Sequence, residues 1–298
     1  MRSSFVPGCE TAFVRTAKLG LGLGVFAAES EGTSLRARMA RDAAAEAARL
    51  AIRAGTALFD GPEGCESLLD TVGDAHFTCH LRAEGLGPDQ FESRIALVRA
   101  RLRASTTFDV LIPGACLVAD DGDALWAAAT AIAERGLCGA VGIVVEPGGD
   151  ALGLARRFKP ALIQVSAGLL DQRLIGSGVL AQIVTLGSAI HLRTTLLHGL
   201  LFLPREGLPP ALAEVGPQVS RVRRKIAEGG ADPLQAALAF ALDRPEAARV
   251  IVEVGSPGEV RALLAAASAP SPQLDWPTMA LDHPAALDAE ASLRRVAA

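Results

Sequence analysis

The sequence contains no tyrosine, and only 4% of its 298 residues are aromatic. A phenolic proton donor is therefore excluded from any chemistry of this chain. Cysteine is sparse and shows no CxxC spacing, and the odd number of cysteines disfavours a disulfide framework. The histidines and cysteines also lack the spacing of a metal site. A reducing cytoplasm is the expected compartment. The five cysteines are Cys9, Cys65, Cys79, Cys116 and Cys138.

Long apolar runs and a dominant charge are missing as well. Glycine, arginine, histidine or proline interrupts every apolar stretch before it reaches membrane-spanning length. The net charge is −4, with both signs mixed along the chain, which does not indicate a nucleic-acid surface. The first residues carry an arginine but no apolar core, so we expect no signal peptide.

Half of the residues are hydrophobic, which is ample for one large core, and strand and helix patterns alternate along the chain. This alternation predicts a (β/α)8 TIM barrel in one domain, 1–298, with an irregular lead-in at about 1–17 and a C-terminal tail at about 270–298. The expected strands cover 18–24, a short segment ending at residue 60, 75–81, 108–112, 139–145, 161–165, 190–194 and 250–254. Helices are expected after a cap at Asp42, from Pro88, after a cap at 120–123, and over 169–186, 219–228, 233–242 and 257–267.

One carboxylate is placed where a barrel carries its chemistry. An amphipathic helix ends at Gly55, and the short strand that follows delivers Asp60 at its carboxyl end. In parallel α/β proteins the active site lies at that end of the strands. The alternative interpretation of Asp60 is a helix cap or an ordinary loop carboxylate.

Glycines at 20, 22 and 24 suggest a dinucleotide-binding fingerprint at first sight. The spacing fails because Val25 stands where the third glycine belongs, and no acidic residue follows at the distance the motif needs. A Rossmann fold is therefore disfavoured.

Several segments resemble the aldo-keto reductases over about residues 18–270. The most specific is 47–69, with the Phe59-Asp60 pair and the later Glu66, and further similar segments are 141–143, Ile163-Gln164 and 193–201. The resemblance implies the barrel fold and NAD(P)H-dependent carbonyl reduction. Family members use an aspartate, a tyrosine, a lysine and a histidine for proton transfer.

Only the aspartate carries over, as Asp60. The family lysine would fall at Cys79 or His80, the family histidine falls at Gly114, and the chain has no tyrosine. The resemblance therefore implies a catalytically impaired homologue. His80 offers an alternative, because histidine titrates near neutral pH and can act as an acid. The other interpretation of His80 is a polar side chain at the barrel mouth.

The nucleotide side is better preserved, and the resemblance implies an NAD(H) site there. Gln164 would hold the nicotinamide carboxamide. Glu253 would repel a 2′-phosphate, which favours NAD(H) over NADP(H). Ser256 begins the last helix, either as a phosphate contact or as a plain helix cap. The loop expected to pass the pyrophosphate contributes Thr194, Leu196, Leu197 and Gly199.

A barrel that keeps the nucleotide side and lacks the tyrosine, lysine and histidine resembles an alphaproteobacterial branch of this family that regulates cell division. That resemblance implies three protein partners: an FtsZ-like division GTPase, a DivJ-like histidine kinase and the ClpXP protease. The protease would read the final Val296, Ala297 and Ala298. The sequence leaves two alternatives open: an active reductase that uses His80, and a purely structural barrel without a ligand.

Overall fold

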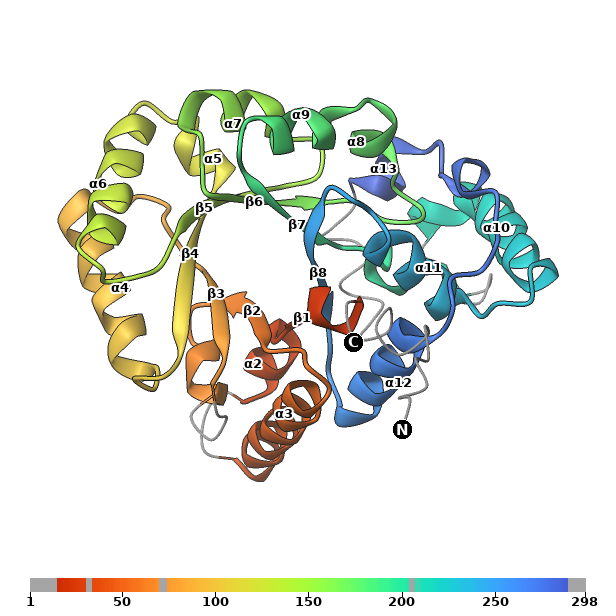
Figure 1. Ribbon diagram of the computed structural model, residues 1–298, viewed down its shortest axis with the longest axis horizontal. Helices are drawn as coiled ribbons and strands as arrows, with labels where there is room; N and C mark the ends of the chain where they lie inside the picture. The colour runs from red at the N-terminus through yellow and green to blue at the C-terminus, as the bar shows by residue number, and fades with distance from the viewer. Residues whose placement is uncertain (1–14, 31–33, 70–73, 204–206, 209, 289–298) are drawn as a thin grey trace, which may run out of the picture.

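A computed structural model describes residues 15–30, 34–69, 74–203, 207–208 and 210–288. Eight parallel strands pair in chain order, and the last pairs with the first, which closes the barrel (Figure 1). The (β/α)8 prediction is thereby confirmed. The strands are β1 (Leu19–Gly22), β2 (Leu58–Pro62), β3 (His76–His80), β4 (Thr107–Pro113), β5 (Val141–Val145), β6 (Leu162–Ser166), β7 (Ala189–Arg193) and β8 (Ala247–Glu253).

The helices lie around the barrel (Figure 1). They are α2 (Gly24–Ser30), α3 (Leu35–Arg53), α4 (Pro88–Arg101), α5 (Gly114–Leu117), α6 (Gly122–Glu134), α7 (Ala151–Phe158), α8 (Arg173–Gly176), α9 (Val179–Thr185), α10 (Gly216–Glu228), α11 (Pro233–Leu242), α12 (Pro257–Ser268) and α13 (Pro284–Leu287). Among the described helices, none combines the length and the apolarity that crossing a membrane requires.

One helix start differs from the sequence prediction. Helix α3 begins at Leu35, because the Ser34 hydroxyl accepts a hydrogen bond from the Ala37 amide and caps the helix there. The predicted cap Asp42 therefore lies inside the helix. At α6 the N-cap is Asp121, within the predicted 120–123, but its side chain makes no capping hydrogen bond. The error at α3 arises because a residue type that caps helices also occurs within them.

The segment predicted as one helix over 169–186 is divided. Residues 173–176 form α8, residues 179–185 form α9, and Gly178 between them has φ 71°. That left-handed conformation suits glycine and stops a right-handed helix.

A second apolar core lies outside the barrel. It joins the loop after β7, helix α10 and the segment after α12, which includes a short 3₁₀ helix, Trp276–Met279. Residues 270–288 belong to the predicted C-terminal tail, yet Met279, Leu281 and Leu287 are buried in this core. The Leu281 amide also donates to the Leu170 carbonyl at 2.9 Å. The end of the tail, 289–298, lies outside the described residues.

The interior of the barrel contains both apolar and polar side chains. Leu111, Val144 and Leu162, from β4, β5 and β6, form a small buried cluster. By strand register Val144 is level with Gln164, and Gln164 is level with His191. Side chains of equal register share one face of a sheet, so these polar groups lie inside the barrel with the apolar cluster.

Candidate functional site

Asp60 lies at the centre of a buried polar cluster. Gln164 Nε2 donates to Asp60 Oδ2 at 2.8 Å, and His80 Nε2 lies 3.0 Å from Oδ2 and 2.9 Å from Oδ1. Strands β2 and β6 are not neighbours, so the contact between Asp60 and Gln164 must cross the barrel interior. The structure therefore brings together three residues that the sequence singled out separately.

The environment of Asp60 favours its carboxylate form. Burial alone would raise the pKa of Asp60, but the neighbouring His80 and the hydrogen bonds from His80 and Gln164 outweigh it and lower that pKa. Because a carboxylate can only accept hydrogen bonds, Gln164 must direct its amide nitrogen at Asp60. Its Oε1 is buried without a partner among the described residues.

His191 and Thr78 are two further interior residues that the sequence analysis did not single out. Thr78 pairs in register with Asp60, and His191 with Gln164. His191 Nδ1 and Thr78 Oγ1 are buried without hydrogen-bond partners in the described part of the chain. Burial lowers the pKa of His191 to about 4 against the attraction of Asp60, so the ring is neutral at pH 7. Their signal in the sequence is a polar residue at an inward position of an otherwise apolar strand.

A second histidine–aspartate pair, His76 and Asp109, also lies on the inward face of the strands. His76 Nε2 is 2.8 Å from Asp109 Oδ2, and His76 Nδ1 is 2.8 Å from Thr107 Oγ1. The Ala140 amide donates to Asp109 Oδ1 at 2.7 Å. Burial alone would raise the pKa of Asp109, but these hydrogen bonds outweigh it and lower that pKa. Sequence reasoning placed His76 on its strand but gave Asp109 no role.

Two positions of the family resemblance have structural explanations. Glu66 is fully buried, accepts from the Gly64 amide at 2.6 Å and forms an ion pair with Arg101 at 2.9 Å, so it fixes the loop after β2. At Gly114 a Cβ atom would approach Leu154 Cδ1 to 2.8 Å. A histidine at Gly114 would therefore require Leu154 to move.

The loop after β7 has an unusual backbone. Thr194 and Leu197 have φ values of 56° and 44°, and Gly199 has φ 79°. Conformations of this kind are rare for residues with a Cβ and often mark functional loops. Leu197 is buried in the second core and Leu196 packs against it, so the loop would meet a ligand with its backbone. The Ser166 hydroxyl donates to Thr194 Oγ1 at 3.1 Å.

The start of the last barrel helix is acidic. Ser256 Oγ accepts from the Glu259 amide at 3.2 Å, and Glu259 Oε2 accepts from the Gly255 amide at 2.9 Å. Ser256 is thus a helix cap, and a carboxylate already occupies the helix N-terminus. The Glu253 carboxylate is exposed and accepts from the Gly24 amide at 3.2 Å.

No protein-family model matches the chain, and no curated protein matches it. Solved structures do match. The holo form of the aldo-keto reductase AKR11C1 from Bacillus halodurans has a TM-score of 0.66 at 16% identity, over 94% of this chain and 92% of that chain. The glycerol dehydrogenase AKR11B4 from Gluconobacter oxydans has a TM-score of 0.65 at 13% identity, over 94% and 90%. The aldo-keto reductase Tm1743, in complex with the inhibitor epalrestat, has a TM-score of 0.64 at 17% identity, over 99% and 97%.

The chain has the fold of the aldo-keto reductases. The matches span almost the whole of both chains, so they include the strands that carry Asp60, His80 and Gln164. Since identities of 13–17% show the fold alone, the activity of this aldo-keto reductase-like barrel has to be argued from its own residues.

Proposed function

We propose that this barrel binds a nicotinamide nucleotide at the carboxyl ends of its strands. The observation that carries the proposal is the buried, unpartnered Oε1 of Gln164, whose amide nitrogen is engaged by Asp60. A buried acceptor without a partner is unfavourable, and a carboxamide NH₂ group would satisfy it. A bound nicotinamide would supply or accept a hydride. Gln164 would orient the ring, while Asp60 holds Gln164 in place.

NAD(H) is the form we propose, rather than NADP(H). Glu259 places a carboxylate at the start of α12, where the adenosine end of the nucleotide would lie by resemblance to the family. Glu253, at the end of β8, places a second carboxylate on the Gly24 amide at the start of α2. Like charges repel, so a 2′-phosphate would be disfavoured, whereas a ribose diol can donate hydrogen bonds to a carboxylate.

We further propose that the protein is a catalytically impaired regulator that acts through protein contacts in the cytoplasm. Three of the four proton-transfer roles of the resembled family have no counterpart in this sequence, and Gly114 is crowded by Leu154. In this respect the chain resembles KidO, a regulator of bacterial cell division. Its proposed partners are an FtsZ-like GTPase and a DivJ-like kinase, with removal by ClpXP through the last three residues.

A reductase that uses His80 is the second candidate. His80 contacts both carboxylate oxygens of Asp60 and its side chain is 21% exposed, so it is held in one orientation and still reaches the mouth. An imidazole oriented by a carboxylate is a common arrangement for proton transfer. In this case Asp60 would be the positioning group and His80 the acid.

Titration of the pure protein with NADH and NADPH, paired with a carbonyl-reduction assay, tests these proposals. We expect saturable NADH binding, weaker NADPH binding and no measurable aldehyde turnover. Gln164→Ala should lose nucleotide binding, while Gln182→Ala, an exposed glutamine on α9, should keep it. Both variants are first checked for folding by circular dichroism.

The outcomes separate the candidates. NADH oxidation that disappears in His80→Ala would favour the reductase and contradict the regulator. A preference for NADPH would contradict the charge argument at Glu253 and Glu259. Binding of neither nucleotide would contradict the site at Gln164. The regulatory role is tested by co-precipitation of FtsZ with and without NADH, where equal recovery in both would contradict control by the nucleotide.

A further inference from the structure

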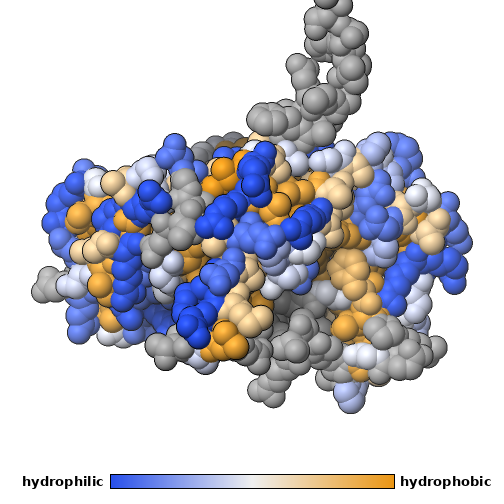
Figure 2. All heavy atoms as spheres, turned by 90° about the horizontal axis from the view of Figure 1, so that it is seen from below, coloured by the Kyte–Doolittle hydropathy of each residue, from blue (hydrophilic) through white to orange (hydrophobic). Residues whose placement is uncertain are grey.

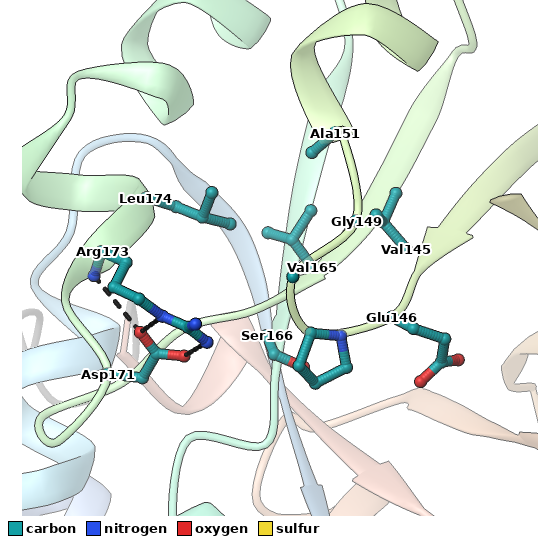
Figure 3. A pocket seen from close by; sticks show the side chains of 11 residues that line it. Val145, Glu146, Gly149, Ala151, Val165, Ser166, Asp171, Arg173 and Leu174 are labelled. Atoms are coloured by element: carbon teal, nitrogen blue, oxygen red, sulfur yellow. Dashed lines mark hydrogen bonds and ion pairs between the residues drawn. The ribbon is translucent and has the colours of Figure 1, made fainter. Parts of the chain in front are cut away.

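A hollow of about 180 Å³ lies between the loops that follow β5 and β6. It lies at the carboxyl ends of β5 and β6, and none of its lining residues belongs to the Asp60 cluster. Figure 3 shows apolar side chains on one side, among them Val145, Val165 and Leu174, with Arg173 and Asp171 facing them. Pockets for drug-sized ligands are larger, from about 300 Å³ upward, so the hollow suits a small molecule.

Arg173 is the cationic group of the hollow. Its Nε and Nη2 donate to the two oxygens of Asp171 at 3.0 and 2.9 Å, which fixes the plane of the guanidinium. Figure 3 shows this group extending from α8 toward Ser166. Nη1 has no hydrogen-bond partner among the described residues. Asp171 is buried, so the pair is a rigid part of the wall.

Arg173 also holds a second carboxylate, which comes from the other end of the described chain. Asp288 Oδ1 lies 2.8 Å from Arg173 Nη2, and both side chains are about 40% exposed, at 41% and 38%. A Cβ on Gly148, in the wall of the hollow, would lie 3.7 Å from Asp288 Oδ1. The Asp288 carboxylate therefore lies at the rim of the hollow, where it is paired with the Arg173 guanidinium.

We propose that the hollow is a binding site for a small aliphatic carboxylate, and that Asp288 occupies the ligand's place on Arg173. A ligand carboxylate would replace that of Asp288 on the guanidinium, so Arg173 would still hold two carboxylates. Its short chain would lie against Val145, Val165 and Leu174. Arg173 suits this role because a planar guanidinium binds carboxylates through paired hydrogen bonds.

The other charged group of the hollow does not oppose this assignment. Glu146 forms an ion pair with Arg193 at 2.7 Å, and its side chain is 54% exposed. Its charge is therefore balanced and largely screened by solvent. Asp171 is paired with Arg173, which holds Asp171 and one further carboxylate, that of Asp288. The proposal does not rest on nucleotide binding, so its failure would leave the proposed function untouched.

Ligand-observed NMR titrations with acetate, propionate and butyrate test the site on the full chain. We expect saturable binding that strengthens with chain length, by up to about fourfold for each methylene that is buried. Butyramide, which keeps the size but lacks the charge, should bind much more weakly. Equal affinity for butyrate and butyramide would overturn the assignment, and so would equal affinity across the acid series.

Substitutions at the ion pair separate the site from nonspecific anion binding. Arg173→Gln should abolish butyrate binding, and Arg173→Lys should weaken it because the paired geometry is lost. Asp288→Ala should strengthen butyrate binding about two- to fivefold, since the Asp288 carboxylate no longer competes with butyrate for Arg173. Asp282→Ala is the matched control: it removes the same charge from the same segment, and it should bind as the parent does.

Circular dichroism verifies the fold of each variant. Undiminished butyrate binding by folded Arg173→Gln would overturn the proposal. If Arg173→Gln does not fold, Asp288→Ala still decides, because an affinity equal to that of Asp282→Ala would contradict the competition by Asp288.

Discussion

At the scale of single residues, the distinctive feature is the number of buried polar groups in the barrel interior. Asp60, Gln164 and His191 are all nine-tenths buried or more, in a place that a TIM barrel usually fills with branched apolar side chains. Burying such groups costs free energy unless they are paired, and some of their atoms have no partner in the described residues. Retained polar groups of this kind mark a candidate site.

His191 should give the protein a measurable dependence of stability on pH. The pKa of its ring is about 4 in the folded state and about 6.5 when unfolded, so below pH 6.5 the unfolded chain binds the proton first. The free energy of unfolding should fall as the pH drops from 6.5 to 4. Urea unfolding should show His191→Gln losing about 2 kcal/mol less than the parent between pH 7 and 5. Parallel losses in the two proteins would contradict the buried, neutral histidine.

At the scale of elements, the loops and helix ends at the barrel mouth are fixed by specific side chains. Ser256, Ser34 and Asp232 cap helices, and Glu66 holds the loop after β2. Arg223, on α10, donates to the carbonyls of residues 200, 201 and 203. These hydrogen bonds hold the loop after β7 in its unusual backbone conformation. These contacts position the backbone that a nucleotide would meet.

Two aspartates allow a matched test of helix capping. Asp232 Oδ1 accepts from the amides of residues 234 and 235 at 2.9 Å, whereas Asp121, also at a helix start, makes no such bond. Asp232→Ala should lower the free energy of unfolding by about 1 kcal/mol. Asp121→Ala should change it by less than about 0.5 kcal/mol. Equal effects in chemical denaturation would contradict the assignment of the caps.

Arg223 should control the order of the loop after β7. Arg223→Met removes the donor to three carbonyls, so amide hydrogen exchange in residues 197–203 should accelerate about tenfold or more. Arg224→Met is the control, because Arg224 is exposed and pairs within its own helix with Glu228. Unchanged exchange in the Arg223 variant would show that the second core alone orders this loop.

At the scale of the whole molecule, the C-terminal part of the described chain packs back against the loops of the barrel. The segment 270–288 packs on the second core and reaches Arg173, so the last described residues contact the mouth (Figure 1). The face in Figure 2 mixes charged and apolar side chains over its described part. The described cysteines, Cys65, Cys79, Cys116 and Cys138, are free thiols.

The final residues should govern the lifetime of the protein in the cell and leave its stability unchanged. Replacing Ala297 and Ala298 with aspartate puts charge where a protease that reads a Val-Ala-Ala end expects small apolar groups. We expect a longer cellular half-life, with the melting temperature and NADH affinity of the parent. Decay at the parental rate would show that the last three residues are not a recognition signal.

The sequence by itself determined the architecture. Strand and helix periodicity follows from residue order, and a parallel strand needs a crossover helix, so the alternation of patterns leads to the barrel. Position also identified Asp60, because a carboxylate at the carboxyl end of a short apolar strand has few structural reasons to be there. These features depend only on residues that are close in the sequence, so they can be recognised without the structure.

Only the tertiary structure decided what Asp60 contacts. Gln164 is 104 positions away, and closure of the barrel brings it within 2.8 Å. Asp109 and His191 gave little signal because an inward polar residue looks like an exposed one until the neighbouring strands cover it. The packing of 270–288 was equally hidden, since its apolar residues follow no helical or strand period and are buried only by the second core and the loop after β6.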